Sequence, residues 1–356
     1  MLTGFKDVDL KIMSELDDRE LLIICLQESE APYINKICSF ENFWKQRAEK
    51  KYGHIKKRRD RSYKNWYLKI VYYEDKYTTY RALEELALGG YKNIDLIEFF
   101  MNKKDIQQWP DDSVVKIMES AGKSGDIKLV DYFVSHKFPI YLALRGGVET
   151  GNKSFVYYIL SRTYPNSNLY DMIFYSAKSG DRELLDFFIE KEEKRIRDET
   201  FLYKAYSMTT PSILSSNDAV LSGAAEGGHL DLVKEYINRI FSNRKNALLH
   251  AVKGGNEDVV NYISKKIIDK KIYRDPEFIA NAARSGNIKI VEFSISKGAY
   301  DWNSGMKGAA ESGHENLINF FIEKGANDWK GGLDYAIKGG YNHIIFFFKR
   351  KLDMNN

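Results

Sequence analysis

The sequence has little of the chemistry on which most enzymes depend. Of its 356 residues only two are cysteine, six are histidine and six are proline. Two cysteines cannot build a zinc site by themselves, and the histidines lie far apart with no H-E-x-x-H pattern. The sequence also contains no G-x-S-x-G motif and no dinucleotide-binding fingerprint. We therefore expect no metal, no cofactor and no catalytic residues, and we predict a binding protein rather than an enzyme.

Long apolar runs are missing as well. No stretch of about 18 apolar residues marks a membrane span, and no secretory signal is recognisable. The two cysteines, Cys25 and Cys38, both lie in the first forty residues. We expect a soluble, cytoplasmic protein of a reducing compartment, with no membrane partner.

The positive charge of the chain is concentrated in one segment. The formal net charge is only +4, but residues 45–69 hold eleven basic residues against Glu49 and Asp60. The run Lys56–Arg61 inside this segment has three interpretations: a solvated linker, a nuclear-import signal or an anion-binding patch. We favour the linker. Because the rest of the chain is net negative, nucleic acid is not expected as a partner.

The stretch AGKSGD, residues 121–126, contains the Gly-Lys-Ser of a phosphate loop. A phosphate loop also needs a glycine five residues before the second glycine, where this chain has Ile117. Similar letters recur as AAEGGH (224–229), AARSGN (282–287) and AAESGH (309–314). We interpret the stretch as one copy of a repeat, with Lys123 and Ser124 in a two-residue variable slot before the glycine.

Glycines mark the repeat along residues 84–356. The commonest separation is 27 residues, and the 48 residues between Gly180 and Gly228 leave room for a degenerate repeat near 199–216. We therefore predict nine repeats, or ten with the degenerate one. The anchoring glycines are Gly90, Gly125, Gly151, Gly180, Gly228, Gly255, Gly286, Gly313 and Gly340.

Each repeat reads as two antiparallel helices. Residues 304–312 form a short first helix, with the small Ala309 and Ala310 where a neighbouring helix must come close, and Gly313 is its left-handed stop. Residues 315–324 form the return helix, with an apolar face. Because such a pair cannot bury both faces alone, stacking is obligatory. The sequence predicts an all-α solenoid.

This frame resembles the ankyrin family. The family's Ala-Ala, Gly-His and Gly-Ala-Asn elements occur with its internal spacing at Ala309-Ala310, Gly313-His314 and Gly325-Ala326-Asn327. The units here are shorter than the family's repeat of about 33 residues, and the missing residues fall where the family builds its β-hairpin. We expect an ankyrin-like array with short loops and little or no β-hairpin.

The resemblance implies a protein target bound by the first helices and the loops before them. The variable slots at the ends of these helices change charge from unit to unit, which suits individual contacts on a common scaffold; drift at solvated corners would give the same pattern. The candidate target-binding residues are Lys123, Lys178, Lys253, Arg284 and Glu311.

Four other residues have two interpretations each. Trp302 and Trp329 stand one 27-residue period apart, so we expect them to plug the seam to the next unit rather than to form a ligand shelf. His229 and His314 follow the anchoring glycines, and we expect them to form hydrogen bonds at the corners rather than to bind a ligand.

Residues 1–52 contain no repeat and predict a small bundle of helices. The order of apolar residues resembles the F-box, a three-helix motif that docks on the Skp-type adaptor of cullin–RING ubiquitin ligases. Its landmarks fall at Leu10, Ile12, Leu16, Leu21, Cys25 and Trp44, although the motif's opening Leu-Pro is Phe5-Lys6 here. The resemblance implies adaptor binding by Leu10, Ile12, Met13, Leu16 and Leu21. The alternative is a cap on the first face of the array.

Residues 53–83 join the two regions. Tyr63, Trp66, Tyr67, Ile70 and Val71 predict an amphipathic helix that packs on the first repeat. The domains expected are thus 1–52, 53–83 and 84–356.

The combination of an F-box-like start and shortened ankyrin-like repeats resembles proteins of large DNA viruses of eukaryotes, which would place the chain in the host cytoplasm. Two functions follow. One is an adaptor that recruits a protein target to a ubiquitin ligase. The other is a scaffold that sequesters its target, with residues 1–52 acting as a cap.

Overall fold

The computed structural model describes Lys11 and residues 13–26, 38–53, 62–103, 112–163, 169–206, 214–239 and 243–354. Every regular element within these ranges is a helix, and none is a strand. The all-α prediction is confirmed. The chain divides into two compact units, Met1–Ser113 and Val114–Asn356, so that the first helix pair of the array belongs to the first unit.

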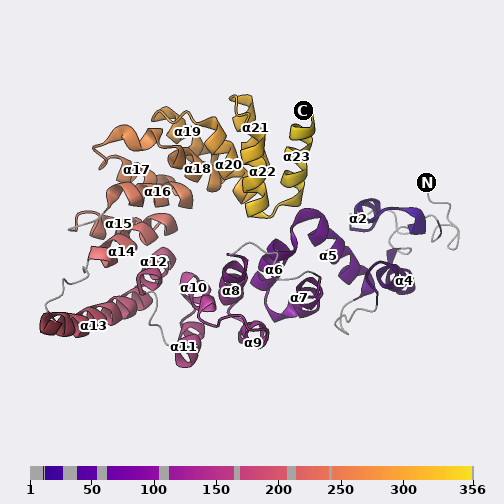
Figure 1. Cartoon of the computed structure of the whole chain (residues 1–356), viewed down its shortest axis with the longest axis horizontal. Coiled ribbons are helices and arrows are strands. Elements are labelled where there is room, and N and C mark those ends of the chain that lie inside the picture. Colours follow the sequence, from indigo (N-terminus) through magenta and orange to yellow (C-terminus); the bar gives the residue numbers. More distant parts are fainter. Residues whose placement is uncertain are drawn as a thin grey trace. The chain divides into compact units, whose positions relative to one another are not determined.

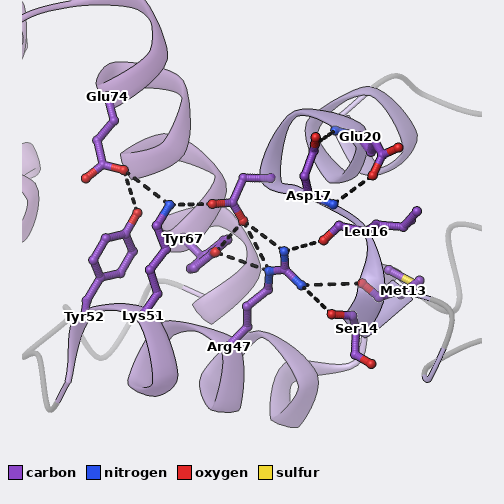
Figure 2. Close-up of polar contacts among 11 residues, drawn as sticks. Met13, Ser14, Leu16, Asp17, Glu20, Arg47, Lys51, Tyr52, Tyr67 and Glu74 are labelled. Atoms are coloured by element: carbon purple, nitrogen blue, oxygen red, sulfur yellow. Dashed lines mark hydrogen bonds and ion pairs between the residues drawn. The ribbon is translucent and has the colours of Figure 1, made fainter.

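In the residues described, the first unit begins with helices from outside the repeats. At the start of α2, the backbone N–H of Glu20 donates to the Asp17 carboxylate and the N–H of Asp17 donates to Glu20, each at 2.8 Å (Figure 2). This reciprocal arrangement is a capping box, and it explains why the helix starts at Asp18. The helices are α2 (Asp18–Leu26), α4 (Glu41–Tyr52), α5 (Tyr63–Lys76), α6 (Thr79–Leu88), the 3₁₀ helix η1 (Tyr91–Asn93) and α7 (Ile94–Met101).

Aromatic side chains form the core of this unit. Trp44, Trp66 and Tyr67 are fully buried, and the ring centroids of Trp44 and Tyr67 lie 5.8 Å apart. Helix α5 contacts α2, α4 and α6. The predicted amphipathic helix at 63–71 is therefore confirmed as the element that joins the N-terminal helices to the first repeat.

Cys25 and Cys38 form a disulfide, with their Cα atoms 5.7 Å apart. The bond ties the C-terminal end of α2 to the residues just before α4, where the Trp44 indole N–H donates to the carbonyl oxygen of Cys38 at 2.8 Å. This pairing runs against the expectation of a reducing compartment, because disulfides persist mainly in oxidising environments.

The second unit consists of helix pairs that follow one another in chain order (Figure 1). From α10 to α22, each first helix contacts the first helix of the next pair, whereas the return helices contact each other less. The first helices are α8 (Ser113–Ser124), α10 (Leu142–Glu149), α12 (Leu169–Ser179), α14 (Leu214–Gly227), α16 (Arg244–Gly254), α18 (Pro276–Arg284), α20 (Trp302–Ser312) and α22 (Trp329–Gly339). The return helices are α9 (Ile127–Ser135), α11 (Lys153–Arg162), α13 (Arg182–Tyr206), α15 (Leu230–Tyr236), α17 (Glu257–Ser264), α19 (Ile288–Ser296), α21 (Glu315–Glu323) and α23 (Asn342–Asp353). A short 3₁₀ helix, η3 (Lys270–Arg274), precedes α18.

All nine anchoring glycines lie between a first helix and its return helix, and all have positive φ. The values run from 65° at Gly125 to 84° at Gly228. A left-handed residue after a helix satisfies its last carbonyl groups, and glycine adopts this conformation without a steric penalty. The predicted paired helices with tight turns are therefore confirmed.

The long interval between Gly180 and Gly228 contains no further helix pair in its described residues. Helix α13 extends to Tyr206, and α14 packs directly on α12. A Cβ at Gly223 of α14 would overlap the carbonyl oxygen of Phe174 in α12. Because these helices already touch, a degenerate tenth repeat does not stand between them.

Trp302 and Trp329 are half-buried at the first positions of α20 and α22. The fully buried rings of these repeats are phenylalanines of the return helices. Phe321 packs over Gly305, and Phe348 packs over Gly332. That the tryptophans plug the seam to the next unit stays a prediction, whereas the phenylalanines fill the interior of each helix pair, where glycine in the first helix makes room for them.

Candidate functional site

The first residue of every variable slot in the second unit is charged. These residues stand two positions before the anchoring glycines, at the C-terminal ends of the first helices, so the repeat places them in one row. We call this row the slot ladder. Its members are Lys123, Glu149, Lys178, Glu226, Lys253, Arg284, Glu311 and Lys338.

In the first half of the slot ladder, ion pairs connect each repeat to the next. The Lys178 ammonium lies 2.8 Å from a carboxylate oxygen of Glu149 and 2.9 Å from one of Glu226. Lys123 pairs with Glu149 at 2.9 Å, and Lys253 pairs with Glu226 at 3.4 Å. Five slots thus form one continuous chain of opposite charges.

A second chain of ion pairs covers the last three slots. The Arg284 guanidinium lies 2.7 Å from Glu311, and Lys338 pairs with the same carboxylate at 2.5 Å. Arg284 also pairs with Glu277 at 2.7 Å and donates to the side-chain oxygen of Asn281 at 2.9 Å. This guanidinium is therefore held on three sides.

Glycine in the second slot position brings neighbouring helix ends together. A Cβ at Gly227 would overlap the carbonyl oxygen of Lys178, and a Cβ at Gly254 would overlap that of Glu226. Without a side chain at this position the backbones approach closely, so the charged side chains one residue earlier can meet. The slot ladder is a consequence of this packing.

The pairing holds the ladder residues in their charged forms. Burial would raise the pKa of the Glu226 carboxyl, but the hydrogen bond with His250 and the charges of Lys178 and Lys253 outweigh it and lower the pKa. For Lys178, burial would lower the pKa of the ammonium, but the two neighbouring carboxylates raise it.

Both predicted corner histidines form hydrogen bonds to the preceding repeat. The Nε2 atom of His229 lies 2.9 Å from the carbonyl oxygen of Lys178, and that of His314 lies 3.1 Å from the carbonyl oxygen of Arg284. Since a carbonyl oxygen only accepts, both Nε2 atoms donate. The prediction of corner hydrogen bonds is confirmed.

All five predicted target-binding residues belong to the slot ladder. The sequence interpretation treated their charges as independent contacts, whereas the structure pairs them across repeats. The role of Glu149 was missed. Its position two residues before Gly151 could have revealed it.

In the first unit, a cluster of polar contacts fixes the N-terminal segment (Figure 2). Arg47 of α4 donates to the carbonyl oxygens of Leu16 at 2.6 Å and Ser14 at 3.3 Å, and to the Asp18 carboxylate at 3.2 Å. The Tyr67 hydroxyl of α5 donates to the same carboxylate at 2.6 Å. Burial would raise the pKa of Asp18, but the contacts with Lys51 and Tyr67, together with that from Arg47, lower it.

The predicted adaptor-binding residues do not form one exposed patch. Met13 and Leu21 are fully buried in the first unit, and Leu16 is half-buried. Leu10 and Ile12 lie outside the described residues, as does the basic run 56–61. The side chains of Met13 and Leu21 therefore serve the packing of this unit.

Comparison with known proteins gives no relative to guide the function: no protein-family model matches the chain, and no curated protein matches it. In the part of the chain that the structure describes, no group of acidic, histidine and cysteine side chains could hold a metal ion. No helix within that part is long and apolar enough to cross a membrane.

Proposed function

We propose that the chain is a protein–protein interaction scaffold that binds a protein target along the slot ladder. The observation that carries this proposal is the register of the ladder, in which charged side chains from successive repeats stand at one position of a rigid helical frame. Such a surface can recognise a pattern of charges, because electrostatic complementarity fixes the register of a partner. The return helices form a separate, structural layer.

The accessibility of the ladder differs along its length. Lys338 and Lys253 have 54% and 46% of their side chains exposed, against 24% for Lys178. The first two present about half of their side chains to a partner, whereas Lys178, held between two carboxylates, mainly keeps its neighbours in place. We assign direct contacts to the exposed residues and a positioning role to Lys178.

For the N-terminal helices, we propose the role of a cap that closes the first repeat. The burial of Met13 and Leu21 and the contacts of α5 with α6 support it. Recruitment of a Skp-type adaptor is the alternative proposal. It would have to use Leu10, Ile12 and Leu16, because the other two predicted contact residues are interior.

Site-specific photocrosslinking tests the target-binding surface. A photoreactive amino acid placed at Lys123 or Lys338 should capture the same protein from a cell lysate. The same group at Lys289, an exposed residue of α19, should not capture it. Capture from Lys289 alone, or of unrelated proteins from the two ladder positions, would show that the ladder is not the binding surface.

A pull-down separates the two proposals for the N-terminal helices. Purified full-length chain is mixed with a Skp-type adaptor, and a variant with Leu16→Asp serves as the comparison. Retention of the adaptor by the full chain and its loss in the variant would establish recruitment. No retention by a folded full-length chain leaves the cap as the role of these helices.

A further inference from the structure

The charges of the slot ladder alternate in sign, with one exception. From Lys123 to Lys253 each cation is followed by a carboxylate, and the alternation resumes after Arg284. At the junction of α16 and α18, however, Lys253 is followed directly by Arg284. Two neighbouring cations repel each other unless an anion lies between them. No carboxylate of the slot ladder stands between these two cations: Lys253 pairs with Glu226 on the preceding helix, and Arg284 pairs with Glu277 and Glu311.

The C-terminal ends of α16 and α18 also leave space between them at this junction. Asn281 of α18 stands where α20 has Gly308, whose missing side chain lets α20 approach α18 closely, and the Asn281 side chain lines the space between α16 and α18. An open pocket of about 480 Å³ lies here. The residues of its wall include Asn246, Leu249, His250 and Asn281 together with the charged Lys253, Glu277, Arg284, Glu311 and Lys338.

The pocket is positively charged. The cations Lys253, Arg284 and Lys338 outnumber the carboxylates Glu277 and Glu311 that share its wall. Lys253 forms the longest ion pair of these cations, 3.4 Å to Glu226 on the preceding helix, against 2.7 Å for Arg284 and 2.5 Å for Lys338 with Glu311. An anion that enters can therefore recruit this ammonium at little cost.

We infer that this pocket receives the carboxylate of an aspartate or glutamate side chain from the bound protein target. The incoming carboxylate supplies a negative charge between Lys253 and Arg284 and completes the alternation along the ladder. This inference rests on the proposed function and adds the chemistry of the recognised segment, which is an acidic peptide.

The two carboxylates in the wall, Glu277 and Glu311, limit how much negative charge a ligand of the pocket can carry. Glu277 pairs with Arg284 from one side, and Glu311 pairs with it from another. A chain of several phosphates brings more negative charge than the three cations and two carboxylates of this wall can compensate, and the excess charge is repelled. A single carboxylate compensates the net charge of the pocket without this repulsion, so a nucleic acid backbone is disfavoured.

Fluorescence anisotropy with a dye-labelled hexaglutamate peptide tests the inference on the full chain. At low salt, the peptide should bind, and Lys253→Met should weaken binding about fivefold to tenfold, the loss expected when one charge of a recognition site is removed. Lys289→Met on α19 is the matched control and should change binding by less than about twofold, as for an exposed charge outside the site. Equal effects of the two variants would overturn the inference.

A second pair of variants places a negative charge inside the pocket. Leu249 lines the pocket one helical turn before Lys253, so Leu249→Glu puts a carboxylate four residues before that ammonium, the favourable order for a helical ion pair. This variant should weaken hexaglutamate binding about tenfold or more by occupying the site. Leu249→Gln has the same shape without the charge and should bind as the parent does.

Two results would show that the pocket has another role. If Leu249→Glu and Leu249→Gln weaken binding equally, shape rather than charge decides, and the assigned carboxylate is wrong. If single-stranded oligothymidylate binds more tightly than hexaglutamate and depends on Lys253, the pocket serves nucleic acid. Capture of one target by both Lys123 and Lys338 together with failure of hexaglutamate would sink the acidic-peptide inference while leaving the proposed function standing.

Discussion

At four of the anchoring glycines, the residue that follows the glycine takes one of two roles. Asn256 and Asn287 cap their return helices by accepting backbone N–H groups, and Asn287 also donates to the carbonyl oxygen of Gly255. His229 and His314 form no side-chain cap. Each donates instead to a backbone carbonyl oxygen of the preceding repeat. A cap contributes about 1 kcal/mol, so the histidine corners exchange helix stability for inter-repeat contact.

Glu226 is the residue on which the first chain of ion pairs depends most. Only 7% of its side chain is exposed, and it is shared by Lys178, Lys253 and His250. Glu226→Gln should lower the free energy of unfolding by about 1–3 kcal/mol, because in a partly buried site Lys253 loses its carboxylate and Lys178 loses one of its two. Urea denaturation followed by circular dichroism measures it. The control Glu277→Gln, more than half exposed, should cost at most about 0.5 kcal/mol.

The ladder carboxylates also make stability depend on pH. The pKa values of Glu149, Glu226 and Glu311 are lowered because, in each, neighbouring cations outweigh the effect of burial. Groups with a lowered folded-state pKa stabilise the fold above their unfolded value, here 4.5, and lose this contribution as pH falls below it. The urea concentration at the unfolding midpoint should therefore be lower at pH 3 than at pH 5. Each unit of pKa shift corresponds to about 1.4 kcal/mol of stability. Glu226→Gln should show a smaller fall than the parent; an equal fall would contradict this assignment.

At the scale of the helix, close approach decides which glycines can be replaced. Gly308 lies inside α20, where a Cβ would overlap the carbonyl oxygen of Ala280 in α18. Gly308→Ala should destabilise the array by about 1–3 kcal/mol, because forcing packed helices apart costs more than the gain of about 1 kcal/mol from the better helix former. Thermal melts measure the change. Glu315→Ala, on the exposed start of α21, should shift the melting temperature little; a stabilised Gly308→Ala variant would mean that the two helices do not meet there.

The helix pairs could be predicted from sequence because their signals are local. Each anchoring glycine, the small residues before it and the apolar face after it lie within one repeat. The ion pairs of the slot ladder could not be predicted in the same way. Lys178 and Glu226 are 48 residues apart and meet only because α14 packs directly on α12, across the long helix α13. The burial of Met13 and Leu21 depends likewise on packing between helices distant in sequence.

At the scale of the whole molecule, the chain holds two units of different construction. The second unit is stabilised by repetition, because each pair of helices is covered by its neighbours. The first unit adds non-repeating helices held by an aromatic core, the Arg47 contacts and one disulfide. The disulfide was not anticipated, because Cys25 and Cys38 approach each other only when α2 and α4 pack on α5.

Reduction should therefore affect the two units differently. The Cys25–Cys38 bond closes a loop with a sequence separation of 13, and such a bond typically contributes about 2–4 kcal/mol, mainly by restricting the unfolded chain. Added dithiothreitol, or the pair Cys25→Ser and Cys38→Ser, should raise amide hydrogen exchange in α2 and α4. Exchange in α16 to α22 should stay as it is, because their protection comes from neighbouring repeats. Faster exchange in α20 on reduction would show that the array depends on the first unit for its stability, whereas unchanged exchange in α2 would show that the Arg47 contacts and the aromatic core hold that helix without the disulfide.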